Sequence, residues 1–170
     1  SGIPEYRLPR AVIDYEIGLF AAMGVEIRTG IRVGRDITVD RLLNSDGFSA
    51  VILATGALRD RSPGIPGEGL TGAQGALAFL AEVNLGGRTA VGRRVAVVGG
   101  GNSAIDAARA AVRLGAREVT IVYRRGEEEM PAQKEEIEAA RAEGIALRLL
   151  TSPVAVLEDG GRARGLRCET

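Results

Sequence analysis

One stretch near the middle of the chain constrains the fold most: a short apolar run that ends in three glycines and passes directly into a helix-forming segment. Residues 95–98 are rich in valine, and the segment after the glycines is rich in alanine. This order is typical of a strand, a phosphate-binding turn and a helix, although glycine-rich turns also occur as plain connections. The helix N-terminus would offer free N–H groups and the positive end of its dipole to phosphates. The candidate cofactor-binding residues here are Gly99, Gly100, Gly101, Asn102, Ser103 and Ala104.

The small residues of this stretch have separate mechanical roles. Gly99 allows the tight turn, Gly101 lets the backbone approach a pyrophosphate, and Ala104 lets the helix and the strand pack closely. Gly115 is a natural stop for the helix, and the β-branched run over 118–123 predicts a second, mostly buried strand. The sequence therefore predicts a complete strand–helix–strand unit of a Rossmann-like α/β domain.

The residues after the second strand indicate which dinucleotide would bind. Sites for NAD carry an acidic residue there, about twenty positions after the glycine turn, which holds the ribose hydroxyls. This chain has Tyr123, Arg124 and Arg125 instead. Guanidinium groups bind a 2′-phosphate through charge-assisted bonds, so the sequence favours NADP(H). The alternative is that the two arginines form a solvated strand end.

With these motifs the chain resembles the NADPH domain of the glutamate synthase small subunit. Dihydropyrimidine dehydrogenase and the flavin subunits of related ferredoxin–NADP oxidoreductases share this module. The resemblance covers essentially the whole chain and rests on six segments in family order, namely residues 2–9, 54–57, 64–68, 99–106, 123–125 and 128–132. Three positions depart from the family pattern, namely Ser49, Gly126 and Glu127, and the charge of Glu127 opposes a preference for a 2′-phosphate.

The resemblance implies an FAD-dependent oxidoreductase in which hydride passes from NADPH to the flavin, and electrons then pass to iron–sulfur centres of a partner subunit or domain. It also implies that Thr55 and Gly56 lie near the flavin, and that Arg7 belongs to a segment near it. Positioning two rings for hydride transfer requires no protein acid or base. We therefore expect cofactor-binding residues and no catalytic residue in this chain.

The resemblance further implies a domain organisation. Residues 1–57 are expected to be part of an FAD-binding domain, 58–75 a linker, and 76–170 an NADPH-binding domain that continues beyond this chain. No second glycine-rich strand–turn–helix occurs in the 170 residues, so we expect NADPH but not FAD to bind this fragment on its own. Residues 1–57 would then expose apolar surface, which predicts loose attachment, exchange between molecules or a homo-oligomer contact through this segment.

Periodicity and turn residues predict the remaining elements. The expected elements are a helix after Pro9 that ends at Gly24, a strand over 25–29, a turn and short helix over 36–43 capped by Thr38, a strand over 48–54, a helix over 130–143, a strand over 145–150, and two final strands joined at 159–161.

Composition excludes several classes of function. Twenty-two basic and 22 acidic residues balance, so nothing points to nucleic acid or to a membrane surface. No apolar run has the length of a membrane span, and a cytoplasmic setting is expected. With Cys168 as the single cysteine and no histidine, the chain has no internal disulfide, no metal-ligand set and no Ser-His or Cys-His nucleophile. The three glutamates at 127–129 are expected to be a solvated first helical turn rather than catalytic acids.

Two other functions remain open from the sequence. The chain is alternatively a nucleotide-binding or subunit-docking module without turnover of its own, or part of a single-cofactor NADP dehydrogenase with a separate substrate domain.

Overall fold

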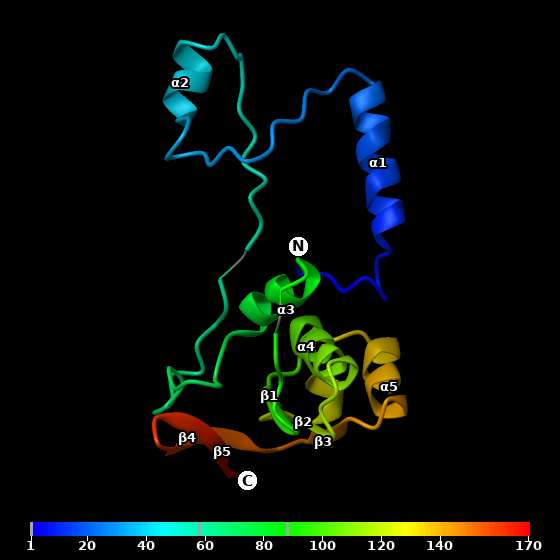
Figure 1. Ribbon diagram of the computed structural model, residues 1–170, viewed down its shortest axis with the longest axis vertical. Coiled ribbons are helices and arrows are strands. Elements are labelled where there is room, and N and C mark those ends of the chain that lie inside the picture. Colours follow the sequence, from blue (N-terminus) through cyan, green and yellow to red (C-terminus); the bar gives the residue numbers. More distant parts are fainter. Residues whose placement is uncertain (1, 58, 88) are drawn as a thin grey trace. The chain divides into compact units, whose positions relative to one another are not determined.

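The computed structural model describes residues 2–57, 59–87 and 89–170 and divides into two compact units (Figure 1). The larger unit comprises Ser1–Leu8 and Arg59–Thr170, and the smaller unit is Pro9–Leu58. The short segment that begins the chain therefore belongs with the larger unit, although the smaller unit follows it in sequence.

A parallel sheet forms the centre of the larger unit. Its strands, in the spatial order β1-β2-β3, are β1 (Arg94–Val98), β2 (Glu118–Val122) and β3 (Ala146–Arg148). Helix α4 (Asn102–Arg113) connects β1 to β2, and α5 (Lys134–Ala142) lies between β2 and β3. Helix α4 ends two residues before Gly115, the predicted stop, whose φ of +94° is left-handed and favours glycine. The predicted strand–helix–strand unit is thus confirmed, with its strands in parallel register.

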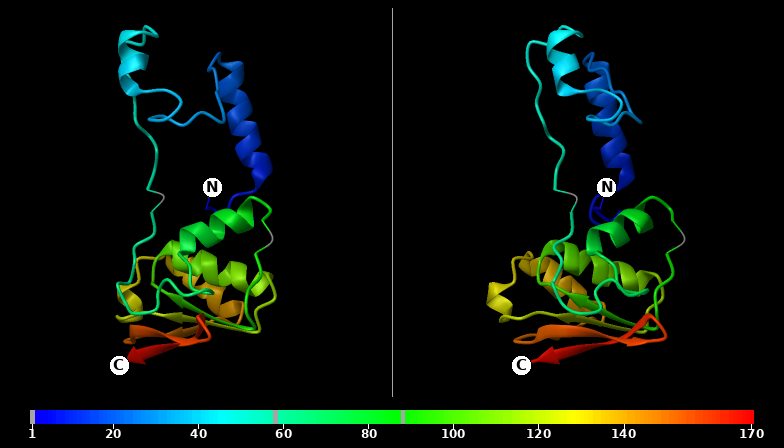
Figure 2. Two further views of the ribbon diagram at one scale, coloured as in Figure 1. Left: turned by 60° about the vertical axis from the view of Figure 1, so that its left-hand side comes forward. Right: turned by 90° about the vertical axis from the view of Figure 1, so that its left-hand side faces the viewer.

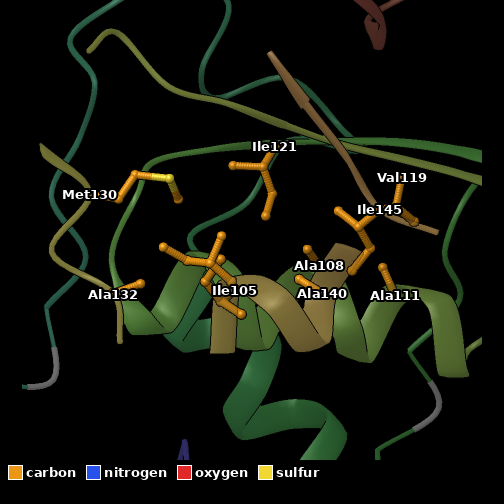
Figure 3. Packing of buried hydrophobic residues seen from close by; sticks show 10 residues of the cluster. Ile105, Ala108, Ala111, Val119, Ile121, Met130, Ala132, Ala140 and Ile145 are labelled. Atoms are coloured by element: carbon orange, nitrogen blue, oxygen red, sulfur yellow. The ribbon is translucent and has the colours of Figure 1, made fainter. Parts of the chain in front are cut away.

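The main hydrophobic core lies between this sheet and the helices on one of its faces (Figure 3). Ile105 of α4 and Ile121 of β2 are fully buried, and Figure 3 shows them between the helix and the strand. Alanines on α4 and α5 keep the helices close to the sheet, because a larger side chain would hold the backbones apart. Helix α3 (Ala76–Asn84) adds a second, smaller core through Phe79 and Leu80, which pack against alanines of α4.

An antiparallel hairpin covers the other face of the sheet (Figure 2). It consists of β4 (Ser152–Asp159) and β5 (Arg162–Glu169), joined at two glycines as the sequence predicts. The glycine- and proline-rich segment before α3 runs beside it: the Val156 N–H donates to the Pro66 carbonyl at 2.8 Å, and the Ala163 N–H donates to the Thr71 carbonyl at 2.8 Å. A β-carbon at Gly67 would lie 2.5 Å from the Val156 carbonyl oxygen, so this close approach requires glycine.

The described residues of the smaller unit form two helices, and neither helix has a buried core. Helix α1 (Arg10–Ala22) follows Pro9 as predicted, and α2 (Val39–Asn44) is capped by the Thr38 hydroxyl, which accepts from the Arg41 N–H. Neither helix buries a residue, and large apolar side chains such as Tyr15 and Met23 remain exposed. In the part of the chain that the structure describes, no helix has both the length and the apolar character needed to cross a membrane.

Four of the predicted elements differ from the structure. The strands expected over 25–29 and 48–54 are absent, because no extended segment among the described residues pairs with them and satisfies their backbone groups. The helix expected over 130–143 begins only at Lys134, since Pro131 keeps Met130 in an extended conformation and a short 3-10 turn, η1 (Glu127–Glu129), precedes it. The strand expected over 145–150 is shorter and ends at Arg148.

Candidate nucleotide-binding site

The glycine turn lies at the carboxyl ends of β1 and β2. The Gly99 N–H donates to the Val122 carbonyl at 3.0 Å, which ties the turn to the neighbouring strand. Gly99 has a φ of +137°, and a β-carbon there would lie 3.3 Å from that of buried Ala104. The turn therefore requires glycine at its first position and a small residue on the facing helix, as the sequence analysis predicts.

The N-terminus of α4 presents unused hydrogen-bond donors. The backbone N–H groups of residues 100–103 donate to no acceptor within the described ranges. No side chain caps the helix; the Asn102 Oδ1 instead accepts from the Gln133 N–H at 3.2 Å. A β-carbon at Gly101 would have only the Pro131 Cγ, at 3.8 Å, within contact range. The arrangement leaves room for an anion that accepts these free donors at the positive end of the helix dipole.

Tyr123 forms one wall of the turn. A β-carbon at Gly100 would lie 2.7 Å from the Tyr123 ring, so the ring occupies the space that any larger residue would need. The tyrosine is held at both ends: its N–H donates to the Arg148 carbonyl at 2.9 Å, and its hydroxyl donates to the Glu129 carbonyl at 2.7 Å. The structure thus brings Tyr123 against the glycine turn.

The loop between β2 and α5 closes onto the same turn, which the reasoning from residue patterns did not find. The Ala132 N–H donates to the Gly100 carbonyl at 3.1 Å, and Met130 and Ala132 are both buried. A signal for this contact was present in the sequence, because an apolar methionine interrupts an otherwise charged stretch after the three glutamates.

Arg124 and Arg125 follow Tyr123 just after β2 ends, at the same end of the sheet as the glycine turn. Both side chains are exposed, and neither has an ion-pair or hydrogen-bond partner among the described residues. Their backbone is fixed, since the Leu150 N–H donates to the Arg125 carbonyl at 3.1 Å. The structure therefore presents two uncompensated guanidinium groups beside a turn with free N–H groups.

Thr55 and Gly56, the other predicted cofactor residues, belong to the smaller unit. They lie in an exposed segment without helix or strand, where Gly56 has a φ of +70°. The role of Thr55 and Gly56 in cofactor binding stays a prediction.

The face of α4 that carries Asp106, Arg109 and Arg113 binds residues 2–8. An Arg7 Nη1 lies 2.9 Å from the Asp106 Oδ2, and the Arg7 Nε lies 3.3 Å from a Glu136 oxygen on α5. Arg109 and Arg113 lie over the Tyr6 ring, 4.5 Å and 4.0 Å from its centroid. These contacts hold residues 2–8 on the helix whose N-terminus forms the candidate site.

Burial and ion pairing set the ionisation of this cluster. Burial raises the pKa of Asp106 despite its contact with Arg7, and the Asp106 Oδ1 has no hydrogen-bond partner among the residues that the structure describes. Hydrogen bonds from Arg113 and Arg109 lower the pKa of Glu143 to about 2. Burial, with a smaller contribution from Asp106, raises the pKa of Tyr6 to about 12. Glu143 and Tyr6 consequently keep their charge states across the neutral range.

The described residues contain no group of three or more histidine, cysteine, aspartate or glutamate side chains that could hold a metal ion. The chemistry of the site thus rests on backbone donors, one aromatic ring and two arginines.

Comparison with known proteins agrees with this geometry. Residues 18–169 match the family model described as pyridine nucleotide-disulphide oxidoreductase. The NADP(+)-dependent formate dehydrogenase subunit beta of Moorella thermoacetica is 43% identical over 170 residues, which are 98% of this chain and 24% of that protein. The glutamate synthase [NADPH] small chain of Halomonas elongata is 39% identical over 98% of this chain and 37% of its own length. The chain thus spans well under half of the length of these relatives. The resemblance to the glutamate synthase small subunit is confirmed.

Solved structures give the same fold. FprA from Mycobacterium tuberculosis superposes with a TM-score of 0.76 and 22% identity, over 98% of this chain and 52% of that one. A thioredoxin reductase from T. acidophilum superposes with a TM-score of 0.52 and 19% identity, over 65% of this chain and 34% of that one. The α/β dinucleotide-binding fold is therefore confirmed, and the chain belongs to the pyridine nucleotide-disulphide oxidoreductase family.

Proposed function

We propose that this chain is the NADPH-binding portion of an FAD-dependent oxidoreductase of the glutamate synthase small-subunit type. The observation that carries the proposal is the pair of unpaired arginines, Arg124 and Arg125, beside a glycine turn whose N–H groups are free. Relatives named for NADP(+) and NADPH, at 39–43% identity over nearly the whole chain, support the same choice of nucleotide.

Each part of the site has a separate task in this proposal. The N–H groups of Gly101, Asn102 and Ser103 bind the pyrophosphate at the start of α4, and Gly101 leaves room for it. Arg124 and Arg125 bind the 2′-phosphate through charge-assisted hydrogen bonds. Tyr123 keeps the turn in shape by packing on Gly100.

NADPH supplies a hydride when it is bound, and the proposed acceptor is the flavin of the intact protein, from which electrons continue to iron–sulfur centres of a partner. The chain's own residues bind and orient the nucleotide, and they transfer no proton. We infer that residues 1–57, with Thr55 and Gly56, belong to the FAD-binding domain, 58–75 to a linker and 76–170 to the NADPH-binding domain. A cytoplasmic location is part of the proposal.

Titration of the 170-residue chain with NADPH and with NADH tests this function. Replacing Arg124 and Arg125 with alanine is expected to weaken NADPH binding by about ten- to a hundredfold per lost contact, because a charge-assisted hydrogen bond contributes about 1.5–3 kcal/mol. NADH binding should change little. Replacing both Arg93 and Arg94 with alanine is the matched control, since this exposed pair lies at the opposite end of the sheet. Equal loss of affinity for both nucleotides in the Arg124/Arg125 variant would show that these arginines do not read the 2′-phosphate.

A further inference from the structure

Three glutamates follow the two arginines after a single glycine, yet no ion pair or hydrogen bond joins them to either arginine among the described residues. The Glu127 carboxylate forms an ion pair with Arg141 of α5. The Glu129 Oε2 accepts from the Gly126 N–H at 2.9 Å, and the Glu128 Oε2 lies 3.6 Å from the Lys134 Nζ. The acidic stretch is therefore bound elsewhere, and Arg124 and Arg125 keep their charge uncompensated.

Glu127 is the carboxylate whose position matters most for a bound phosphate. It stands two residues after Arg125, so their α-carbons lie within about 7 Å of one another. Side-chain charges on residues this close in sequence can approach within one Debye length, about 8 Å at physiological salt, where screening by salt is incomplete. A Glu127 side chain without its partner on α5 would either pair with an arginine of the site or repel the 2′-phosphate.

We propose that Arg141 determines nucleotide specificity by acting through Glu127. It is a positioning residue: it holds the Glu127 carboxylate on the α5 side and neutralises it, which leaves Arg124 and Arg125 free for the 2′-phosphate. The proposal rests on the proposed function, since it concerns the same nucleotide. The alternative is that the ion pair only anchors the loop of residues 126–133 to α5. In that case Glu127→Gln and Arg141→Gln should weaken nucleotide binding to the same degree.

The test is a cycle of Arg141→Gln, Glu127→Gln and the double variant of the 170-residue chain, each titrated with NADPH and NADH at low and high salt. Arg141→Gln is expected to weaken NADPH binding about three- to tenfold, because a Glu127 carboxylate without its cation would repel the 2′-phosphate across a partly screened surface. Affinity for NADH should stay unchanged. Glu127→Gln should bind NADPH at least as tightly as the original chain, and the double variant should recover that affinity. The loss in Arg141→Gln should shrink at high salt.

Lys134→Gln provides the matched control, because it removes the same charge from α5 and breaks an ion pair in which both side chains are exposed. It should leave both affinities unchanged. The inference is overturned if Glu127→Gln weakens binding as Arg141→Gln does, which is the result for a simple anchor, or if Arg141→Gln affects both nucleotides equally. If the original chain binds neither nucleotide, the proposed function fails, and this inference fails with it; binding of NADPH without the expected cycle overturns the inference alone.

Discussion

At the scale of single residues, the three consecutive glycines differ in what requires glycine at each position. The positive φ requires glycine at 99 and the Tyr123 ring requires it at 100, whereas no described residue requires it at 101. This difference separates the residues that shape the turn from the residue that leaves space for a ligand.

Substituting alanine at two of these positions should therefore separate stability from binding. Gly100→Ala would drive a methyl group into the Tyr123 ring and should destabilise the chain by about 1–3 kcal/mol in urea unfolding. Gly101→Ala has space and an ordinary φ of −93°, so it should cost less than about 1 kcal/mol. Its NADPH affinity should nevertheless fall about tenfold or more, if one phosphate hydrogen bond is lost. Unchanged nucleotide binding in Gly101→Ala would argue against a pyrophosphate at this position.

The local part of this site could be predicted from the sequence, because it depends on near neighbours along the chain. A single strand–turn–helix pattern predicts the turn at Gly99, the start of the helix at Asn102 and its end just before Gly115. The contact of Ala132 with Gly100 joins segments that no periodicity links, so it became visible only in the structure. The docking of Arg7 on Asp106 is a contact of the same kind.

At the scale of elements, α4 and α5 are joined by ion pairs as well as by their shared core. Glu143 at the end of α5 accepts from the Arg109 Nε at 2.9 Å and from the Arg113 Nη1 at 2.6 Å, and its side chain is 23% exposed. Glu136 adds a contact of 2.6 Å to Arg109. Arginines on the polar face of α4 thus form ion pairs with glutamates on α5 and at its end.

This pairing predicts a sensitivity to acid. The folded-state pKa of Glu143 is about 2, below its ordinary value of 4.5, so its contribution to stability is present above pH 4.5 and is lost as the pH falls from 4.5 toward 2. Glu143→Gln should be less stable than the original chain at pH 7 and should lose less stability across that acid range. Urea unfolding at pH 7, 4.5 and 3 measures both effects.

Glu138→Gln serves as the comparison for that experiment, because Glu138 lies on the same helix and is exposed. Its stability should follow the pH dependence of the original chain. An identical acid dependence in all three proteins would show that the contacts of Glu143 contribute nothing measurable.

At the scale of the whole molecule, the two units differ in how much they bury. Strands β1 and β2 and helix α4 enclose a core in the larger unit, whereas α1 and α2 leave all their residues at least partly exposed. Local opening is easiest where few apolar contacts hold the backbone.

The rate of amide hydrogen exchange in the monomeric 170-residue chain should therefore differ between the two units. Amides of the Pro9–Leu58 unit are expected to exchange within minutes, while those of β2 and α4 should be protected for much longer. Light scattering should accompany the measurement, because exchange of the smaller unit between molecules would protect it in an oligomer. Uniform protection in a monomer would contradict the expectation.

The docking of residues 2–8 on α4 has a consequence for the free energy of folding. Because these residues bind the larger unit, the 50 residues of Pro9–Leu58 form a loop whose two ends are both held. Closing a flexible loop of that length costs an entropy term of (3/2)RT ln n, about 3.5 kcal/mol. Contacts of Tyr6 and Arg7 must offset this term whenever the smaller unit is unstructured. Once the smaller unit folds with its ends at a fixed separation, the term disappears, and order in either part then stabilises the other.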